Sequence, residues 1–202
     1  YIQECLESLE AQTCKDFEAI VVCDHCDEDA KSAVTELTLT FSVAVLDTGE
    51  KTGVAAARNI GLAACQQEYV FFMDCDDFLR QRAVEEMLQA AVGQDMVYVR
   101  RYYSWIGYRG FLEMEKLPED SKERTTYINT SRIDREDKTF PILPSDASHW
   151  ETVFYHLTKS VIRFSFLSAL NLLIRRDILL TNDIVFDETF TYYTDMAFMV
   201  RA

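Results

Sequence analysis

The sequence lacks a hydrophobic run long enough to cross a membrane. Its longest apolar runs, FSVAVL at 41–46 and YVFFM at 69–73, fall far short of the roughly 20 residues that a spanning helix needs. We also expect no secretory signal, because residue 1 already lies in a helix-like pattern. Hydrophobic residues still make up 49% of the 202 residues, which is enough for a sizeable core. We therefore expect a soluble domain of ordinary size, with room for a subdomain or an insertion.

Positive charge is scarce. The chain has 20 Lys and Arg residues against 34 Asp and Glu residues, which gives a formal net charge of −14. A surface of that sign repels polyphosphate backbones and anionic lipid, so the sequence argues against nucleic-acid binding. A small phosphorylated ligand is still compatible with this charge, provided that a divalent cation mediates the contact.

The sequence has no second cysteine pair to match its single CxxC. Six cysteines stand at positions 5, 14, 23, 26, 65 and 75, and only CDHC at 23–26 has a spacing typical of metal ligands. A structural zinc site normally needs two such pairs, or one pair with a matched distal pair. The pattern therefore favours reduced cysteines, packed in an intracellular protein, over a zinc site.

Hydrophobic periodicity alternates between short apolar runs and amphipathic segments over the first hundred residues. The spacing predicts strands over 18–23, 41–46, 69–73 and 95–103, and helices over 2–9, 27–38, 54–65 and 80–92. This alternation predicts an α/β fold, with a mostly parallel sheet covered by helices on both faces. Ligands of such sheets bind beyond the carboxyl ends of the strands. Asp24 follows the first strand and Asp74 follows the third, which predicts one shared site.

Three carboxylates come directly after the third strand, in the segment DCDD. In extended backbone, residues i and i+2 project from the same face, so we expect Asp74 and Asp76 to point together. Two ionised carboxylates a few ångströms apart repel by about 1 kcal/mol in water, which backbone amides, an arginine or a cation can offset. Oxygen ligands suit Mg²⁺ or Mn²⁺, which keep positions open for phosphate oxygens. A plainer interpretation is that Asp76 or Asp77 caps a helix beginning near Phe78.

The pattern loosens beyond residue 103. The segment 107–146 is charged and rich in turn residues, which predicts a long excursion or an insertion, and helical periodicity resumes over 149–170. We therefore divide the chain into a first half, 1–103, and a second half, 104–202, that contains the insertion. A group of aromatic residues near this boundary either stacks on a sugar or packs in the core; its members are Tyr102, Tyr103, Trp105 and Tyr108.

Four segments, in order along the chain, carry recognisable motifs. They are CLESLEAQTCKDFEAIVVCD at 5–24, TGVAAARNIGLAAC at 52–65, EYVFFMDCDDFL at 68–79 and FDETFTYYTDMAF at 186–198. Together they resemble the family 2 glycosyltransferases, whose members have a helix ending in S-L-x-x-Q-T, an A-R-N-x-G helix, a strand running into D-x-D-D and a later F-D-E segment. The resemblance implies an inverting enzyme of the GT-A fold, with a Rossmann-like sheet. Residues 1–103 would be its nucleotide-sugar-binding half, and residues 104–202 a partly helical acceptor-side half.

The resemblance implies a role for each matched polar residue. Asp24 would contact the base of a nucleotide sugar, usually uridine, and Arg58 would lie beside that base or its phosphates. Asp74 would approach the ribose and the cation, and Asp76 would ligate the Mn²⁺ or Mg²⁺ that grips the diphosphate. Supporting positions would be Asp77, Gly53 and Asn59.

On the acceptor side, the resemblance implies that Asp195 is the general base. It would take a proton from an acceptor hydroxyl, which attacks the anomeric carbon in line and inverts it. One carboxylate suffices because the metal-bound diphosphate leaves without a strong acid, whereas glycosidases need two. A UDP-sugar is the favoured donor, and a glycan, a lipid-linked saccharide or a cell-envelope polymer is the expected acceptor. The expected location is the cytoplasm, including the inner membrane face if other parts of the protein attach there.

Three features depart from the family pattern. The usual D-D-G-S after the first strand reads CDHC, and the acidic pair before the base reads Thr194-Asp195. The family begins with a strand of the S-V-I-I-P-x-Y-N type, and this sequence starts just after it, at Tyr1. Because that strand lines the nucleotide pocket, we expect a gap or an unusual edge in the sheet.

Two other functions stay open. A nucleotidyltransferase is also an α/β enzyme with metal-binding carboxylates, but it normally shows an early Gly-rich loop bearing Lys or Arg, which this sequence lacks. A catalytically inactive module, which keeps the fold for interactions, is compatible with CDHC and with the missing strand.

Overall fold

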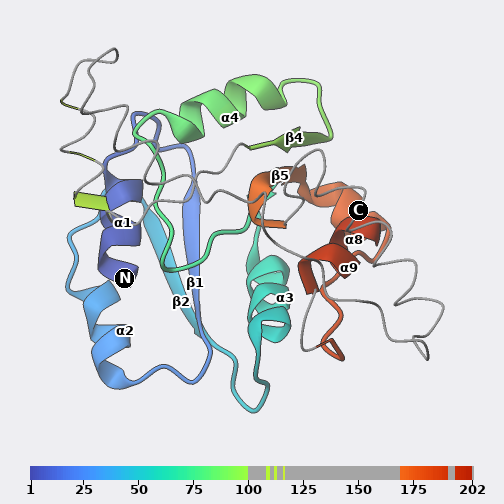
Figure 1. Cartoon of the computed structure of the whole chain (residues 1–202), viewed down its shortest axis with the longest axis horizontal. Helices are drawn as coiled ribbons and strands as arrows, with labels where there is room; N and C mark the ends of the chain where they lie inside the picture. Colours follow the sequence, from blue (N-terminus) through green and yellow to red (C-terminus); the bar gives the residue numbers. More distant parts are fainter. Residues whose placement is uncertain (100–107, 110–111, 113–115, 117–168, 191–193, 202) are drawn as a thin grey trace, which may run out of the picture. The chain divides into compact units, whose positions relative to one another are not determined.

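The computed structural model describes residues 1–99, 169–190 and 194–201, together with residues 108, 109, 112 and 116. The chain divides into two compact units, one made of Tyr1–Val99 and Ser145–Ala202, the other of Arg100–Pro144. All the elements named below belong to the first unit (Figure 1). The division into functional halves at residue 103 stays a prediction.

Periodicity predicted the secondary structure of the first hundred residues well. The described elements are, in chain order, α1 (Ile2–Glu10), β1 (Glu18–Cys23), α2 (Glu28–Thr35), β2 (Ser42–Asp47), α3 (Val54–Ala64), β3 (Tyr69–Phe71), α4 (Ala83–Ala91), β4 (Met96–Tyr98), η1 (Ala169–Asn171), β5 (Leu172–Arg175), α8 (Arg176–Thr181) and α9 (Thr194–Arg201). Every strand and helix predicted up to residue 99 is found, with its described ends shifted by at most a few residues. No helix among those described combines the length and the hydrophobicity of a membrane-spanning segment.

Some predictions fall on parts of the chain that the structure does not describe. The helical segment expected over 149–170 is described only at its last two residues, which begin the 3₁₀ helix η1. Tyr102, Tyr103 and Trp105 also lie outside the described residues, whereas Tyr108 is described and is buried.

β1 and β2 form a parallel pair that lies between two helical layers. Successive side chains of a strand point to opposite faces, so Ala19 and Val21 share one face and Ile20 and Val22 the other. On the first face, α1 and α2 contribute to a hydrophobic cluster with Ala19 and Val21. On the second face α3 packs closely, with Gly61 facing the side chain of Val22. This arrangement confirms the expected α/β layering.

A second sheet has the strand order β3-β5-β4, and both of its pairings are antiparallel. Val70 of β3 lies opposite Ile174 of β5, and Val97 of β4 lies opposite Leu173. The central strand therefore comes from the C-terminal part of the chain and is inserted between two strands of the N-terminal part. The sequence pattern did not indicate this strand.

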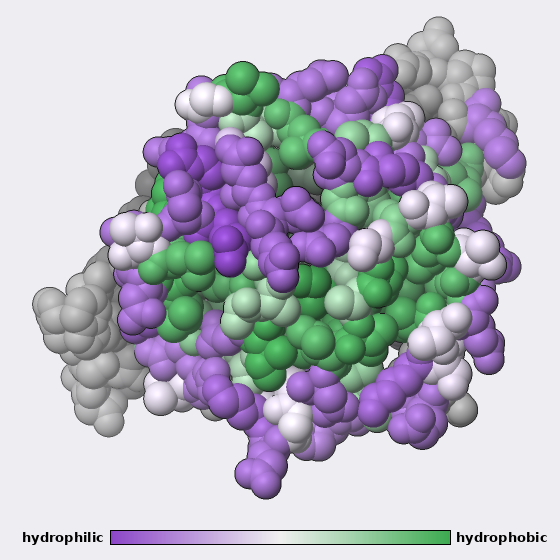
Figure 2. Space-filling model, turned by 180° about the vertical axis from the view of Figure 1, so that it is seen from behind, coloured by the Kyte–Doolittle hydropathy of each residue, from purple (hydrophilic) through white to green (hydrophobic). Residues whose placement is uncertain are grey.

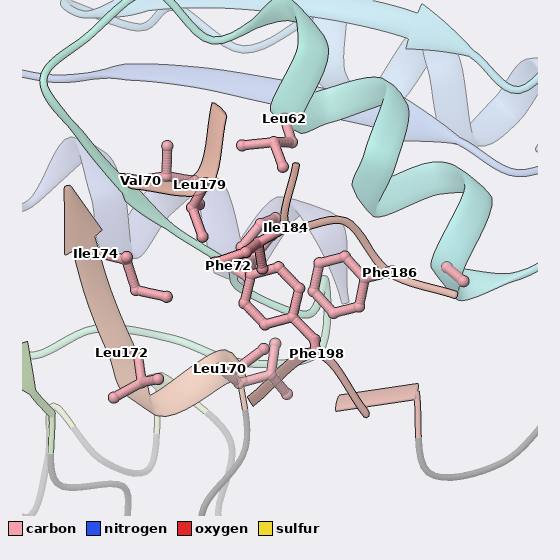
Figure 3. Close-up of a cluster of buried hydrophobic side chains, with 12 residues drawn as sticks. Leu62, Val70, Phe72, Leu170, Leu172, Ile174, Leu179, Ile184, Phe186 and Phe198 are labelled. Carbon is pink, nitrogen blue, oxygen red and sulfur yellow. The ribbon is translucent and has the colours of Figure 1, made fainter. Parts of the chain in front are cut away.

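Aromatic side chains fasten the C-terminal segment to the end of β3 (Figure 3). Phe186 and Phe198 stack with ring centroids 4.2 Å apart and an interplanar angle of 9°. Phe72 meets Phe186 edge-on, at 5.0 Å and 88°. Such aromatic pairs add about 0.5–1.5 kcal/mol each beyond the burial of their area. This packing holds the segment that follows residue 186 near the carboxyl end of β3, where DCDD begins.

The expected gap in the sheet lies between β1 and β3. Within the described part of the chain, β1 pairs with β2, β3 pairs with β5, and no hydrogen-bonded ladder joins the two sheets. A groove of about 890 Å³ separates them, lined along one side by residues 18–22 and along another by residues 69–72. Figure 2 shows hydrophobic residues gathered across the middle of the face seen from behind, with hydrophilic residues around them. The unpaired edges of two strands therefore border one largely apolar groove.

Candidate active site

Three loops and one distant segment meet beyond the carboxyl ends of β1, β2 and β3. The loops carry Asp24, the stretch 48–53 and the acidic stretch 74–77, and the distant segment comprises residues 186–190 and 194–195. Hydrogen bonds and ion pairs connect all four. That Asp24 and Asp74 contribute to one shared site stays a prediction.

Asp24 is held by the loop that follows β2. Its carboxylate accepts hydrogen bonds from the Gly53 N–H at 2.9 Å and from the Thr48 hydroxyl at 3.3 Å, and it pairs with Nδ1 of His25 at 3.1 Å. Gly53 has a φ of +100°, which side-chain-bearing residues rarely adopt, so glycine is needed for this approach. The His25 ring and then the Gly53 amide lower the pKa of Asp24 below its usual range. Asp24 therefore presents a fixed, ionised acceptor.

Arg58 lies between two carboxylates that are far apart in sequence. Its Nη2 is 3.1 Å from Oδ1 of Asp74, and its Nη1 makes an ion pair with Oδ1 of Asp195. The guanidinium carbon also lies 5.3 Å from the centre of the Phe186 ring. The Arg58 side chain is only 12% exposed, so these contacts are screened less than surface ion pairs. One arginine thus joins the acidic stretch after β3 to the first turn of α9.

The acidic stretch after β3 forms a compact cluster. Carboxylate oxygens of Asp74, Asp76 and Asp77 lie within 4.8 Å of one another. The Asp77 N–H donates to the Asp74 carbonyl at 3.1 Å, so the backbone turns here. The expectation that extended geometry alone would align Asp74 and Asp76 is wrong, because a turn gathers all three carboxylates. The interpretation that Asp76 or Asp77 caps a helix is wrong as well, because the next helix begins only at Ala83, with Arg82 as its N-cap residue.

Three converging carboxylates are a donor set that suits a hard divalent cation such as Mg²⁺ or Mn²⁺. The neighbouring thiol of Cys5 reflects the negative potential of the cluster. Burial first, and then Cys75, Asp77 and Asp76, raise the pKa of Cys5 to about 12. Its Sγ lies 4.0 Å from the Asp74 carbonyl oxygen, directly under the turn. The carboxylates of Asp74, Asp76 and Asp77 therefore fit a divalent cation.

Asn59 fixes the distant segment to α3. Its amide donates to the Phe186 carbonyl and accepts from the Phe186 N–H, each at 2.8 Å, and donates to Glu188 at 3.1 Å. Glu188 in turn pairs with Lys51 at 3.0 Å. Sequence reasoning gave Asn59 only a supporting place and missed Lys51, because its partner is separated by more than a hundred residues and no spacing rule connects them.

Comparisons with known proteins agree with this fold and site. The family model described as Glycosyl transferase family 2 matches residues 1–171. The chain is 32% identical over 132 residues to the glycosyltransferase GlyA of Streptococcus pneumoniae, covering 65% of this chain and 19% of that protein. It is 26% identical over its whole length to a teichoic acid poly(glycerol phosphate) polymerase of Staphylococcus epidermidis, of which it covers 24%. The chain thus spans about a quarter or less of these two relatives.

Solved structures give the same result for the fold. The crystal structure of TarS 1–349 of S. aureus in complex with UDP-GlcNAc superposes with a TM-score of 0.65 at 19% identity, covering 100% of this chain and 49% of that one. The complex of the same protein with UDP gives a TM-score of 0.63. At such identities the likeness establishes the fold, which is the expected GT-A type. The family match over most of the chain, together with this fold, shows that the chain belongs to glycosyl transferase family 2.

Proposed function

We propose that this chain forms the nucleotide-sugar-binding part of an inverting, metal-dependent glycosyltransferase. The observation that carries the proposal is the Arg58 bridge between Asp74 and Asp195, beside the three-carboxylate cluster. It joins a cation-binding stretch and a candidate base, which the reaction requires on either side of the transferred sugar. Family membership supports the reaction class.

Each group has a chemical task in this proposal. Asp24, ionised and fixed by Gly53 and Thr48, accepts a hydrogen bond from the nucleotide base. Asp76 and Asp74, with Asp77 beside them, would hold Mn²⁺ or Mg²⁺, which would supply positive charge for the departing diphosphate. Asp195 takes the proton of the acceptor hydroxyl as that oxygen attacks the anomeric carbon.

Arg58 has a positioning task. Its two N–H groups contact Asp74 and Asp195 at once, so the base and the cation-binding stretch keep a fixed separation. An arginine suits this task because its planar fork of donors is rigid and always charged. Binding energy is then not spent on bringing two loops together at the moment of reaction.

The relatives suggest the donor and the acceptor. TarS is solved with UDP and with UDP-GlcNAc, which supports a UDP-sugar as donor. Relatives named as a teichoic acid polymerase and as a poly(ribitol-phosphate) β-N-acetylglucosaminyltransferase support a cell-envelope polymer as acceptor. Such a reaction would take place in the cytoplasm or at the inner face of the membrane.

Calorimetric titration of the intact protein with UDP, with and without Mn²⁺, tests the proposal. We expect binding that requires Mn²⁺ and that is lost in the variant Asp76→Asn. The matched control is Asp16→Asn, which removes one exposed charge before β1, at the opposite end of that strand from Asp24. Equal Mn²⁺-dependent affinity in Asp76→Asn and Asp16→Asn would refute the metal role of the cluster.

Titration with UDP and with a nucleoside triphosphate, together with an assay of UDP release from a UDP-sugar, separates the alternatives. A catalytically inactive interaction module predicts no Mn²⁺-dependent UDP binding and no release of UDP from a UDP-sugar. A nucleotidyltransferase predicts binding of a nucleoside triphosphate in preference to UDP. Family membership argues against this second alternative.

A further inference from the structure

Two polar side chains near the end of α1 are buried. Ser8 is 0% exposed and Gln12 is 4% exposed. Both belong to the segment that matches S-L-x-x-Q-T, and the function proposed above gives neither of them a task. A polar side chain costs free energy when it is buried without hydrogen-bond partners. The partners of Ser8 and Gln12 therefore indicate why polar residues stand at these two positions.

Ser8 connects α1 to the backbone that follows the acidic stretch. Its hydroxyl donates to the Cys5 carbonyl at 2.7 Å and accepts from the Leu79 N–H at 3.1 Å. The first contact is an ordinary bond of a serine to the preceding turn of its own helix. The second reaches a residue 71 positions away, which comes two residues after Asp77. The Ser8 hydroxyl therefore holds the chain at the exit of the carboxylate cluster.

Gln12 holds the same connection and the start of α4. Its Nε2 donates to the Arg80 carbonyl at 2.8 Å and to the Ser8 carbonyl at 3.0 Å. Its Oε1 accepts from the Val84 N–H at 3.1 Å. Val84 lies in the first turn of α4, where the side chain of the N-cap residue, Arg82, makes no capping hydrogen bond. Gln12 thus supplies, from another helix, an acceptor that the first turn of α4 lacks.

The acidic stretch is consequently held on both sides. Before it, β3 ends at Phe71 and is paired with β5. After it, Leu79 and Arg80 are fixed to α1. Between these two supports, the Asp77 N–H donates to the Asp74 carbonyl and closes the turn. Carboxylates within 4.8 Å of one another repel when no cation lies between them, which favours a looser turn. Support on both sides opposes this loosening.

We propose that Ser8 and Gln12 are positioning residues for the cation site. Their hydrogen bonds to the backbone of Leu79, Arg80 and Val84 hold the acidic stretch in its compact turn before a cation binds. This inference deepens the function proposed above and rests on it. A donor set that is already in place does not spend binding free energy on ordering the loop. Groups that orient metal ligands in this way contribute about 10–100-fold to metal affinity.

Two substitutions and a matched control test the proposal in the intact protein. Ser8→Ala removes the acceptor for the Leu79 N–H, and Gln12→Met keeps the length of the side chain without its hydrogen bonds. The control is Thr13→Ala, which removes an exposed hydrogen bond of 3.0 Å to Glu85 of α4. Calorimetric titrations with UDP at several Mn²⁺ concentrations give the Mn²⁺ concentration at which UDP affinity is half-maximal. We expect this concentration to rise about tenfold in Ser8→Ala and in Gln12→Met, and to stay unchanged in Thr13→Ala.

Hydrogen exchange of the metal-free protein gives a readout that needs no ligand. In the unmodified protein, the amides of Leu79 and Val84 should exchange more slowly than in the unfolded chain, because both donate hydrogen bonds to buried side chains. Ser8→Ala should speed exchange at Leu79, while exchange along β1 stays as it is in the unmodified protein. If the Leu79 amide of the unmodified protein exchanges as fast as in an unfolded chain, the turn is not held in advance and the inference is refuted, whether or not the variants fold.

The titrations separate this inference from the function on which it rests. Ser8→Ala and Gln12→Met could need no more Mn²⁺ than Thr13→Ala while unfolding at lower urea concentrations. The two side chains would then only stabilise the packing of α1 on α4, so the positioning role would be refuted and the proposed function would be untouched. If the unmodified protein shows no Mn²⁺-dependent binding of UDP, the proposed function is refuted and the positioning role with it.

Discussion

Replacing Asn59 by alanine tests whether one amide holds the candidate base in place. The substitution removes two hydrogen bonds of 2.8 Å to the Phe186 backbone and one of 3.1 Å to Glu188. A hydrogen bond contributes about 0.5–1.5 kcal/mol net, and a part-buried backbone group left without a partner costs about 1–3 kcal/mol. We therefore expect Asn59→Ala to lower the free energy of unfolding by about 2–4 kcal/mol.

Urea denaturation measures this loss directly, as a lower midpoint with an unchanged slope. For a chain of this size the melting temperature should fall by about 4–16 °C. Catalysis should respond differently from binding. Asp195 follows the segment that Asn59 fixes, whereas Asp24 is held by other groups. Turnover should therefore fall at saturating donor, while the affinity for UDP changes little.

Asn182→Ala is the matched control for this measurement. It also removes an asparagine amide, which donates one exposed hydrogen bond of 2.9 Å to the Ile178 carbonyl at the end of α8. Its expected cost is below about 1 kcal/mol. If the two variants unfold at the same urea concentration, the Asn59 contacts stabilise the fold no more than an exposed hydrogen bond does. The inference that Asn59 holds the segment before Asp195 in place is then refuted.

Three further substitutions test other parts of the site. Arg58→Lys keeps the positive charge but loses the guanidinium group that contacts Asp74 and Asp195 together. Turnover should fall about 100-fold or more, while circular dichroism shows an unchanged fold. Near-native turnover would contradict the bridging role of Arg58. Phe198→Ala removes a fully buried ring stacked on Phe186 and should lower the free energy of unfolding by about 3–5 kcal/mol in urea, against a smaller loss for Phe198→Leu. The pKa of Asp24 is lower in the folded protein than the value of about 3.9 expected for the unfolded chain. The interactions of its carboxylate therefore stabilise the fold fully above about pH 3.9, and this stabilisation is lost as the pH falls through the folded pKa. Thermal melts between pH 5 and pH 2 should therefore be less pH-dependent in Asp24→Asn than in the unmodified protein, and identical slopes would contradict this assignment.

Local pattern was sufficient for most of the fold before residue 99. The strands there are short apolar runs and the helices are amphipathic, so periodicity and flanking polar residues define them. β5 was missed because LLIR is a short apolar run, which periodicity cannot assign to a strand or a helix. Its place in the sheet depends on pairing with β3 and β4, which lie far from it in sequence.

The residues of the candidate site could be predicted from the sequence only where they lie in a recognisable motif. Asp24, Arg58, Asp74 and Asp195 were identified from sequence segments, and the structure connects Arg58 to both Asp74 and Asp195. The turn that adds Asp77 to the cluster was missed, since the apolar run before DCDD suggested that extended backbone continues. The contacts of Lys51 with Glu188 and of Asn59 with Phe186 depend on tertiary folding alone, and no local signal predicts them.

The groove between β1 and β3 has a consequence for how the chain behaves at high concentration. Amide and carbonyl groups along an open strand are a template for any other extended peptide, including the same strand in a neighbouring molecule. Preparations of residues 1–202 should therefore oligomerise as concentration rises, through backbone pairing that salt does not dissolve.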